Sequence, residues 1–168
     1  MRTAKDITLP AVFTALLLGG QFVLSGISGV EIVTVLLLSF AYRYGIRQGL
    51  VVANAFSLLR CFIFGFIPNV LVLYLVYYNL FVLVFGAVGN LFAKEYSVKK
   101  HVVVIVLSLV MTIAFTMLDN VITPLMYGFL PNVWEAYFIA SLYTLIPQLV
   151  CTFVTVLLIF PVLTKILK

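Results

Sequence analysis

Long apolar runs follow one another through most of this 168-residue chain, and few charges interrupt them. A helix of about 20 apolar residues crosses the roughly 30 Å hydrocarbon core of a bilayer. The chain is 65% hydrophobic and 9% charged, with a mean hydropathy of +1.28, and a soluble fold of this size cannot bury so much apolar surface. We therefore predict an all-α integral membrane protein, a compact bundle of six transmembrane helices that forms a single domain over residues 1–168. The predicted helices are 7–24, 30–42, 48–66, 69–92, 102–118 and 137–166.

The basic residues indicate how the bundle is oriented. Nine of the ten fall at one set of helix ends: Arg2, Lys5, Arg43, Arg47, Lys94, Lys99, Lys100, Lys165 and Lys168. Because lysine and arginine are enriched in cytoplasmic loops, both termini are expected in the cytoplasm. The net charge of +5 is therefore a topogenic signal, and we expect a lipid bilayer around the chain and no nucleic acid as a partner. The first segment has no small-residue cleavage site after it, so we interpret it as a retained helix.

Small residues recur at helical spacing in the first segment, within PAVFTALLLGG. Ala11, Ala15 and Gly19 are four residues apart and form one stripe of a helix. In a bilayer, such stripes let two helix backbones approach closely. The stripe either packs inside the bundle or is a docking face for another protein, and Gly19 alone can serve the bundle. A similar spacing at Gly45, Gly49 and Ala53, and at Gly86 and Asn90, predicts tight packing of the cytoplasmic helix ends.

Arg60 is the only basic residue away from those ends. It follows Arg47 by thirteen residues, roughly 20 Å along a helix, which places it in the outer half of the membrane. A charged residue inside a membrane segment usually faces a cavity or a counter-ion. Arg60 therefore either contacts an anionic group of a ligand, or extends to the outer headgroups or pairs with Glu31 or Asp119.

Tyr74 and Tyr78 begin an aromatic stripe in the fourth segment, with Asn79 beside it. The stripe either walls a pocket for a flat, ring-containing ligand or belongs to the core or the lipid-facing surface. A carboxamide at this depth should find a hydrogen-bond partner on another helix or on a ligand, which applies to Asn79 and to Gln148.

The outer connection at residues 119–136 contains two prolines, a glycine and several large apolar side chains. We predict an outer loop that folds back on the membrane surface or over a cavity, and we interpret it as a candidate lid. Trp134 either belongs to this lid or lies at the membrane interface, as tryptophan often does.

Catalytic chemistry finds no support in the sequence. His101 is the only histidine, and we find no G-x-x-x-x-G-K-[ST] loop, no H-E-x-x-H and no closely spaced metal-binding set. We expect a protein that is not an enzyme, binds no metal or cofactor, and takes any energy for uphill transport from a partner or an ion gradient.

Three features together resemble a known family: six helices with both termini inside, Ala11-x-x-x-Ala15 in the first helix, and YRYGIRQGLVVANAFSLLR around the second cytoplasmic turn. The chain resembles, over essentially its whole length, the substrate-binding S components of energy-coupling factor (ECF) transporters. The resemblance implies a multi-pass protein of a prokaryotic cell membrane that captures a vitamin or a vitamin precursor.

The resemblance also implies partners and roles. In that family the A-x-x-x-A face docks on a membrane-embedded T subunit, which couples to two cytoplasmic ATPase subunits that hydrolyse ATP. Ala11 and Ala15 would make this contact. The substrate of the family lies in the outer half of the bundle, which gives the following candidate substrate-binding residues by position: Arg60, Tyr74, Tyr78, Asn79, Asn120, Trp134, Gln148 and, from the first outer loop, Glu31.

Two other interpretations remain open. The chain is alternatively a standalone small permease or channel, in which the small-residue stripes join copies of itself, or an assembly subunit without a ligand.

Overall fold

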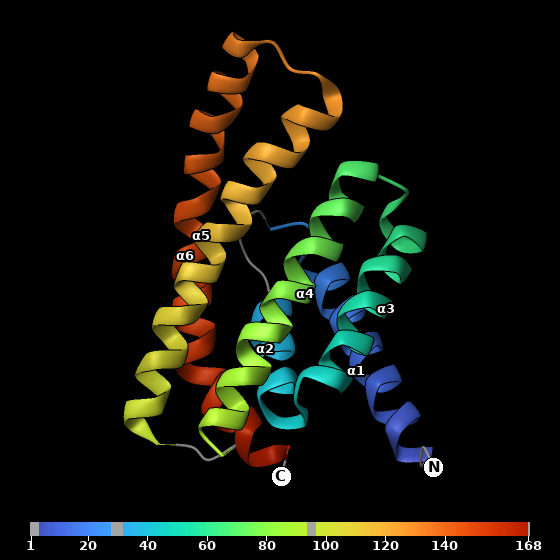
Figure 1. Cartoon of the computed structure of the whole chain (residues 1–168), viewed down its shortest axis with the longest axis vertical. Coiled ribbons are helices and arrows are strands. Elements are labelled where there is room, and N and C mark those ends of the chain that lie inside the picture. Colours follow the sequence, from blue (N-terminus) through green and yellow to red (C-terminus); the bar gives the residue numbers. More distant parts are fainter. Residues whose placement is uncertain (1–3, 28–31, 94–96, 168) are drawn as a thin grey trace.

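The computed structural model describes residues 4–27, 32–93 and 97–167, and every regular element in these residues is an α-helix (Figure 1). The six helices are α1 (Ala4–Leu24), α2 (Val33–Tyr44), α3 (Ile46–Phe64), α4 (Pro68–Leu91), α5 (Val98–Tyr127) and α6 (Pro131–Ile166). The prediction of an all-helical fold is confirmed for the described part of the chain.

The helices run alternately between two ends of the bundle. α1 begins and α6 ends at one end, which we call the termini end (Figure 1). The α3–α4 and α5–α6 connections lie toward the opposite end, which we call the hairpin end. The α5–α6 pair extends beyond the tips of α3 and α4 there (Figure 1).

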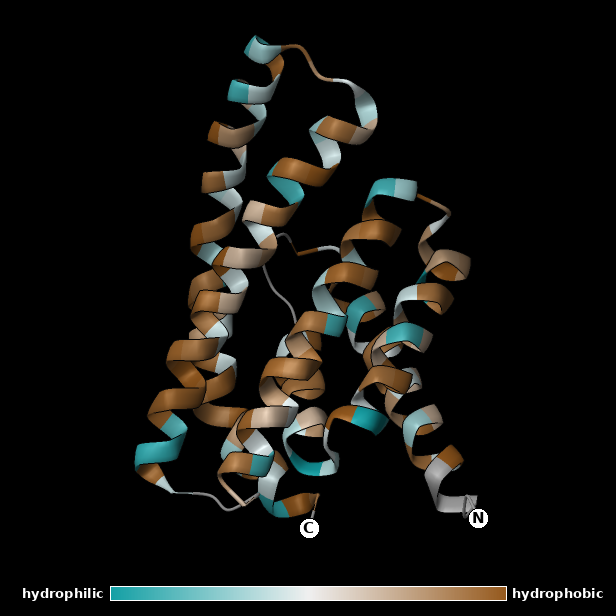
Figure 2. Cartoon of the chain, in the orientation of Figure 1, coloured by the Kyte–Doolittle hydropathy of each residue, from teal (hydrophilic) through white to brown (hydrophobic). Residues whose placement is uncertain are grey.

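Five of the six helices are long and apolar enough to cross a membrane. The chain is therefore a membrane protein, and apolar residues cover most of the length of these helices (Figure 2). α2 corresponds to the predicted second span, 30–42, but its 12 residues cover only about 18 Å, which is too short to cross the hydrocarbon core. Nine of these twelve residues are buried, so α2 is enclosed by its neighbours rather than facing lipid along its length.

The predicted outer loop at residues 119–136 is wrong. α5 continues to Tyr127 and α6 begins at Pro131, so only residues 128–130 connect the two helices. Gly128 ends α5 in the left-handed conformation, at φ 63° and ψ 45°, and its N–H donates to a carbonyl of the last turn. α6 then begins at Pro131. Proline fits this first position because a backbone N–H here would have no hydrogen-bond partner within the helix.

Pro124, within the predicted loop, lies inside α5. A proline cannot donate to the carbonyl oxygen four residues earlier, which here belongs to Asn120. The indole Nε1 of Trp134 donates to that oxygen at 2.8 Å. The helix therefore tolerates the proline because a side chain of α6 replaces the missing backbone donor.

Glycines permit close contact between helices toward the termini end. A Cβ on Gly89 of α4 would overlap the carbonyl group of Tyr42, and one on Gly86 would lie 2.7 Å from Cγ1 of Ile46. A Cβ on Gly49 of α3 would lie 2.6 Å from a methyl carbon of α4. The predicted tight packing of these glycine-bearing ends is confirmed.

Candidate functional site

Arg60 lies in the fourth turn of α3, in the half of the helix nearer the hairpin end. Its guanidinium carbon is 4.7 Å from the ring centroid of Tyr74 and 5.0 Å from that of Phe64. Its Nε atom is buried and has no hydrogen-bond partner within the described residues. The positive charge of Arg60 therefore lies against two aromatic rings, which is a favourable contact for a cation. The Nε–H donor of the same guanidinium forms no hydrogen bond within the described residues.

Gln21 of α1 contacts the hydroxyl group of the same tyrosine. Its Nε2 donates to the Tyr74 hydroxyl at 3.1 Å, and its Oε1 is buried without a partner among the described residues. A residue with an unused donor, Arg60, and a residue with an unused acceptor, Gln21, therefore both contact Tyr74 where α1, α3 and α4 meet. The sequence interpretation missed Gln21, although a carboxamide inside an apolar helix is the signal that singled out Asn79 and Gln148.

Tyr78 lies in the aromatic cluster that supports this junction. Its ring centroid is 5.0 Å from that of Tyr74, 5.5 Å from Phe56 and 5.2 Å from Tyr77, all with edge-to-face geometry. Tyr78 is only 2% exposed. The structure therefore brings Tyr74 into contact with Arg60, and Tyr78 packs against Tyr74 as part of the buried core.

Asn79 does not point toward Arg60. Its Nδ2 donates to Oδ1 of Asn54 at 3.1 Å, and Nδ2 of Asn54 donates back to Oδ1 of Asn79 at 3.0 Å. We expected a hydrogen-bond partner on another helix or on a ligand, and the structure shows the partner on another helix. Since both amides are paired, Asn79 ties α4 to α3.

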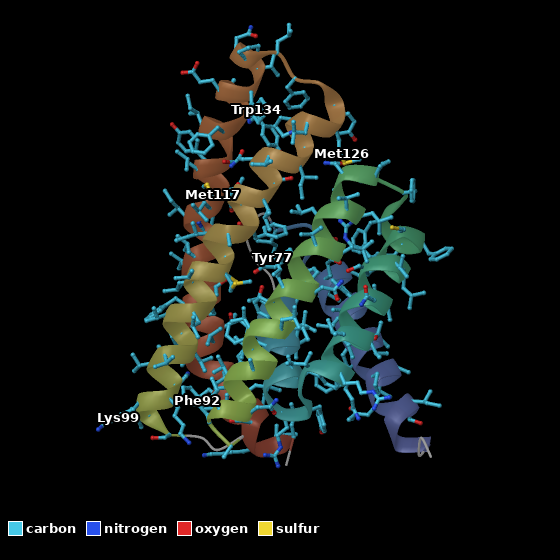
Figure 3. All side chains as sticks on the ribbon, in the orientation of Figure 1. Tyr77, Phe92, Lys99, Met117, Met126 and Trp134 are labelled. Atoms are coloured by element: carbon cyan, nitrogen blue, oxygen red, sulfur yellow. The ribbon has the colours of Figure 1, made fainter. Side chains whose placement is uncertain are left out.

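Gln148 of α6 borders a small cavity of about 10 Å³ between α4, α5 and α6. Tyr77, which points from α4 toward α5, and Tyr78 form part of the wall (Figure 3). Gln148 Oε1 is buried with no partner in the described part of the chain. A space of this size holds about one water molecule, so Gln148 lies beside the aromatic cluster without opening a pocket for a larger ligand.

Asn120 and Trp134 lie on the α5–α6 hairpin, and Trp134 is near its tip (Figure 3). Asn120 is 3% exposed, and its Nδ2 donates to Ser141 Oγ at 2.8 Å. With the bond from the Trp134 indole to the Asn120 carbonyl, these contacts join the two helices. The structure does not bring this pair to Arg60, and Glu31 lies outside the described residues.

The small-residue stripe of α1 is exposed. Ala11, Ala15 and Gly19 all face outward, and a Cβ added to Gly19 would meet no heavy atom within 4 Å. Ala11 and Ala15 line a groove of about 830 Å³ between α1 and α3. Gly20, not Gly19, is the glycine of α1 that packs inside, since a Cβ there would lie 2.7 Å from Ile32.

Among the described residues, no group of three His, Cys, Asp or Glu side chains is placed to hold a metal ion. Comparisons with models of protein families, with curated proteins and with solved structures gave no match. The arrangement itself offers two features: an exposed groove beside Ala11 and Ala15, and a cation with unused hydrogen-bonding capacity at Arg60.

Proposed function

We propose that this chain is the substrate-capturing subunit of an importer of the ECF type, in a prokaryotic cell membrane. It binds a vitamin or a vitamin precursor toward the hairpin end, docks on a T subunit, and depends on two ATPase subunits for energy. The bundle carries no nucleotide-binding motif of its own, which fits this division of labour.

The exposed stripe of α1 carries the proposal. Small residues that serve internal helix packing are covered by their neighbours, as Gly49, Gly86 and Gly89 are here. Ala11 and Ala15 are instead uncovered and line a groove on the lipid-facing surface. Because lipid gives no hydrophobic drive for helix association, small residues at this spacing favour a partner helix through close backbone packing.

Arg60 supports the capture step. A guanidinium in an apolar helix is costly unless it is paired or serves a ligand, and here its contacts are the rings of Tyr74 and Phe64. Its unused Nε donor and the unused Oε1 acceptor of Gln21 suit a ligand that carries an anionic group next to a hydrogen-bond donor.

The docking step is tested by co-purification. The chain is co-expressed with a tagged T subunit and the ATPase pair of the same organism, and retention on the affinity resin is measured. We expect the double variant A11W/A15W to lose retention, because indole rings fill the groove. The control A140W places an indole ring on the exposed residue Ala140 of α6 and should be retained. Full retention of A11W/A15W would contradict the proposed docking.

The alternative, a standalone permease or channel, would use the same groove to bind a second copy of this chain. The mass of the purified chain in nanodiscs separates the two candidates. Two results together would favour the permease: the wild type is a dimer that the A15W substitution converts to a monomer, and the chain does not bind the T subunit. A wild-type monomer supports the importer subunit.

A further inference from the structure

The groove between α1 and α3 has a charged residue at one end, and most of its other lining residues are apolar. α1 and α3 lie side by side and run in the same direction (Figure 1). Arg47, in the first turn of α3, is exposed at the termini end of the groove. From there the lining continues through Val51 to Leu59 on α3, and through Ala15 to Leu18 on α1.

The length of the groove matches one leaflet of a bilayer. Arg47 and Leu59 are twelve residues apart, which is about 18 Å along a helix. Half of the hydrocarbon core is about 15 Å thick. A lipid of one leaflet begins at its headgroup and ends near the bilayer centre, so its length is similar to that of the groove.

The chemistry of the groove also matches a lipid. The guanidinium of Arg47 can donate two parallel hydrogen bonds to a phosphate, which is its preferred geometry with that anion. Ala11 and Ala15 leave room against α1 because their side chains are short, and Val51 and Leu59 present apolar walls. At about 830 Å³, the groove is large enough to hold a substantial part of a lipid molecule.

We propose that the α1–α3 groove of the free chain binds one anionic phospholipid, with its phosphate at Arg47 and an acyl chain along Ala11, Ala15 and Leu59. The lipid site is a property of the chain alone and does not rest on the importer assignment. If the chain docks on a T subunit through the same groove, the lipid leaves first, so lipid and partner compete.

Native mass spectrometry tests this lipid site. The chain is reconstituted alone in nanodiscs of equal parts phosphatidylglycerol and phosphatidylcholine, released in the gas phase, and the retained lipids are counted by mass. We expect one phosphatidylglycerol on the wild type, and a loss of about tenfold or more in its occupancy ratio for R47Q, because a charge-assisted hydrogen bond is removed. A15L, which narrows the groove, should also lower occupancy.

Two controls match these variants. K165Q removes a positive charge from the exposed residue Lys165 at the same end of the bundle, and A140L adds the same bulk as A15L on α6. Both should retain the lipid as the wild type does. Equal retention of phosphatidylglycerol by R47Q and K165Q, or equal retention of the two lipids by the wild type, would overturn the proposal. Because no T subunit is present, either result leaves the docking experiment to be decided separately.

Discussion

Gly89 and Gly19 are glycines of membrane helices with opposite surroundings. A Cβ on Gly89 would overlap the carbonyl group of Tyr42, where α4 crosses α2, while one on Gly19 would meet nothing within 4 Å. The first position therefore needs glycine for packing, and the second leaves an open surface on α1.

Alanine substitution at these two positions tests the packing. We expect G89A to lose about 1–3 kcal/mol of stability or more, because the backbone of α2 or α4 must move to admit the methyl group. G19A should be unchanged or slightly more stable, since alanine favours the helix. Thermal unfolding in detergent measures both. Equal stability of the two variants would contradict the close α2–α4 contact.

Single residues of the candidate site were only partly predictable. The rarity of charge in apolar segments is enough to single out Arg60, and helical spacing places Tyr74 and Tyr78 on one face. Spacing cannot show which helix a face meets, so the pairing of Asn79 with Asn54 and the contact of Gln21 with Tyr74 emerge only from the packing.

The α5–α6 hairpin is the element that sequence patterns described least well. Prolines and a glycine within residues 119–136 are typical of a loop, yet α5 and α6 extend through all of this range except residues 128–130. The helical conformation around Pro124 depends on a contact between helices that the sequence pattern does not show. The indole of Trp134 donates to the Asn120 carbonyl, which Pro124 leaves without its backbone donor. The number and order of the helices, in contrast, follow from the apolar runs.

Replacing Trp134 by Phe tests this account of the hairpin. The variant keeps an aromatic ring and removes the indole donor, which leaves the Asn120 carbonyl unpaired at a cost of about 1–3 kcal/mol. We expect faster hydrogen exchange of the amides of Gly128 and Phe129, which bond to Pro124 in the last turn. Y143F, at a tyrosine that is 76% exposed, is the control. Identical exchange in both variants would contradict a structural role of the indole.

At the scale of the whole molecule, the basic residues predict the orientation in the membrane. Lys99 is at the termini end and Trp134 is near the tip of the hairpin (Figure 3). In a chain with Cys61 and Cys151 replaced by alanine, the variant K99C should react with an impermeant thiol reagent only after cells are opened. N132C, at the exposed start of α6, should react in intact cells. The reverse pattern would contradict cytoplasmic termini.

We propose above that the bundle captures a small anionic molecule at Arg60 and passes it on by docking through α1. Mass spectrometry of small molecules extracted from the purified protein tests it most directly, with a detergent blank and with the variants R60Q, K165Q and A15W. We expect one anionic compound in near-equimolar amounts in the wild type, K165Q and A15W, and its depletion in R60Q. A wild type indistinguishable from the blank, or the same amount of the compound in R60Q as in K165Q, would contradict the claim.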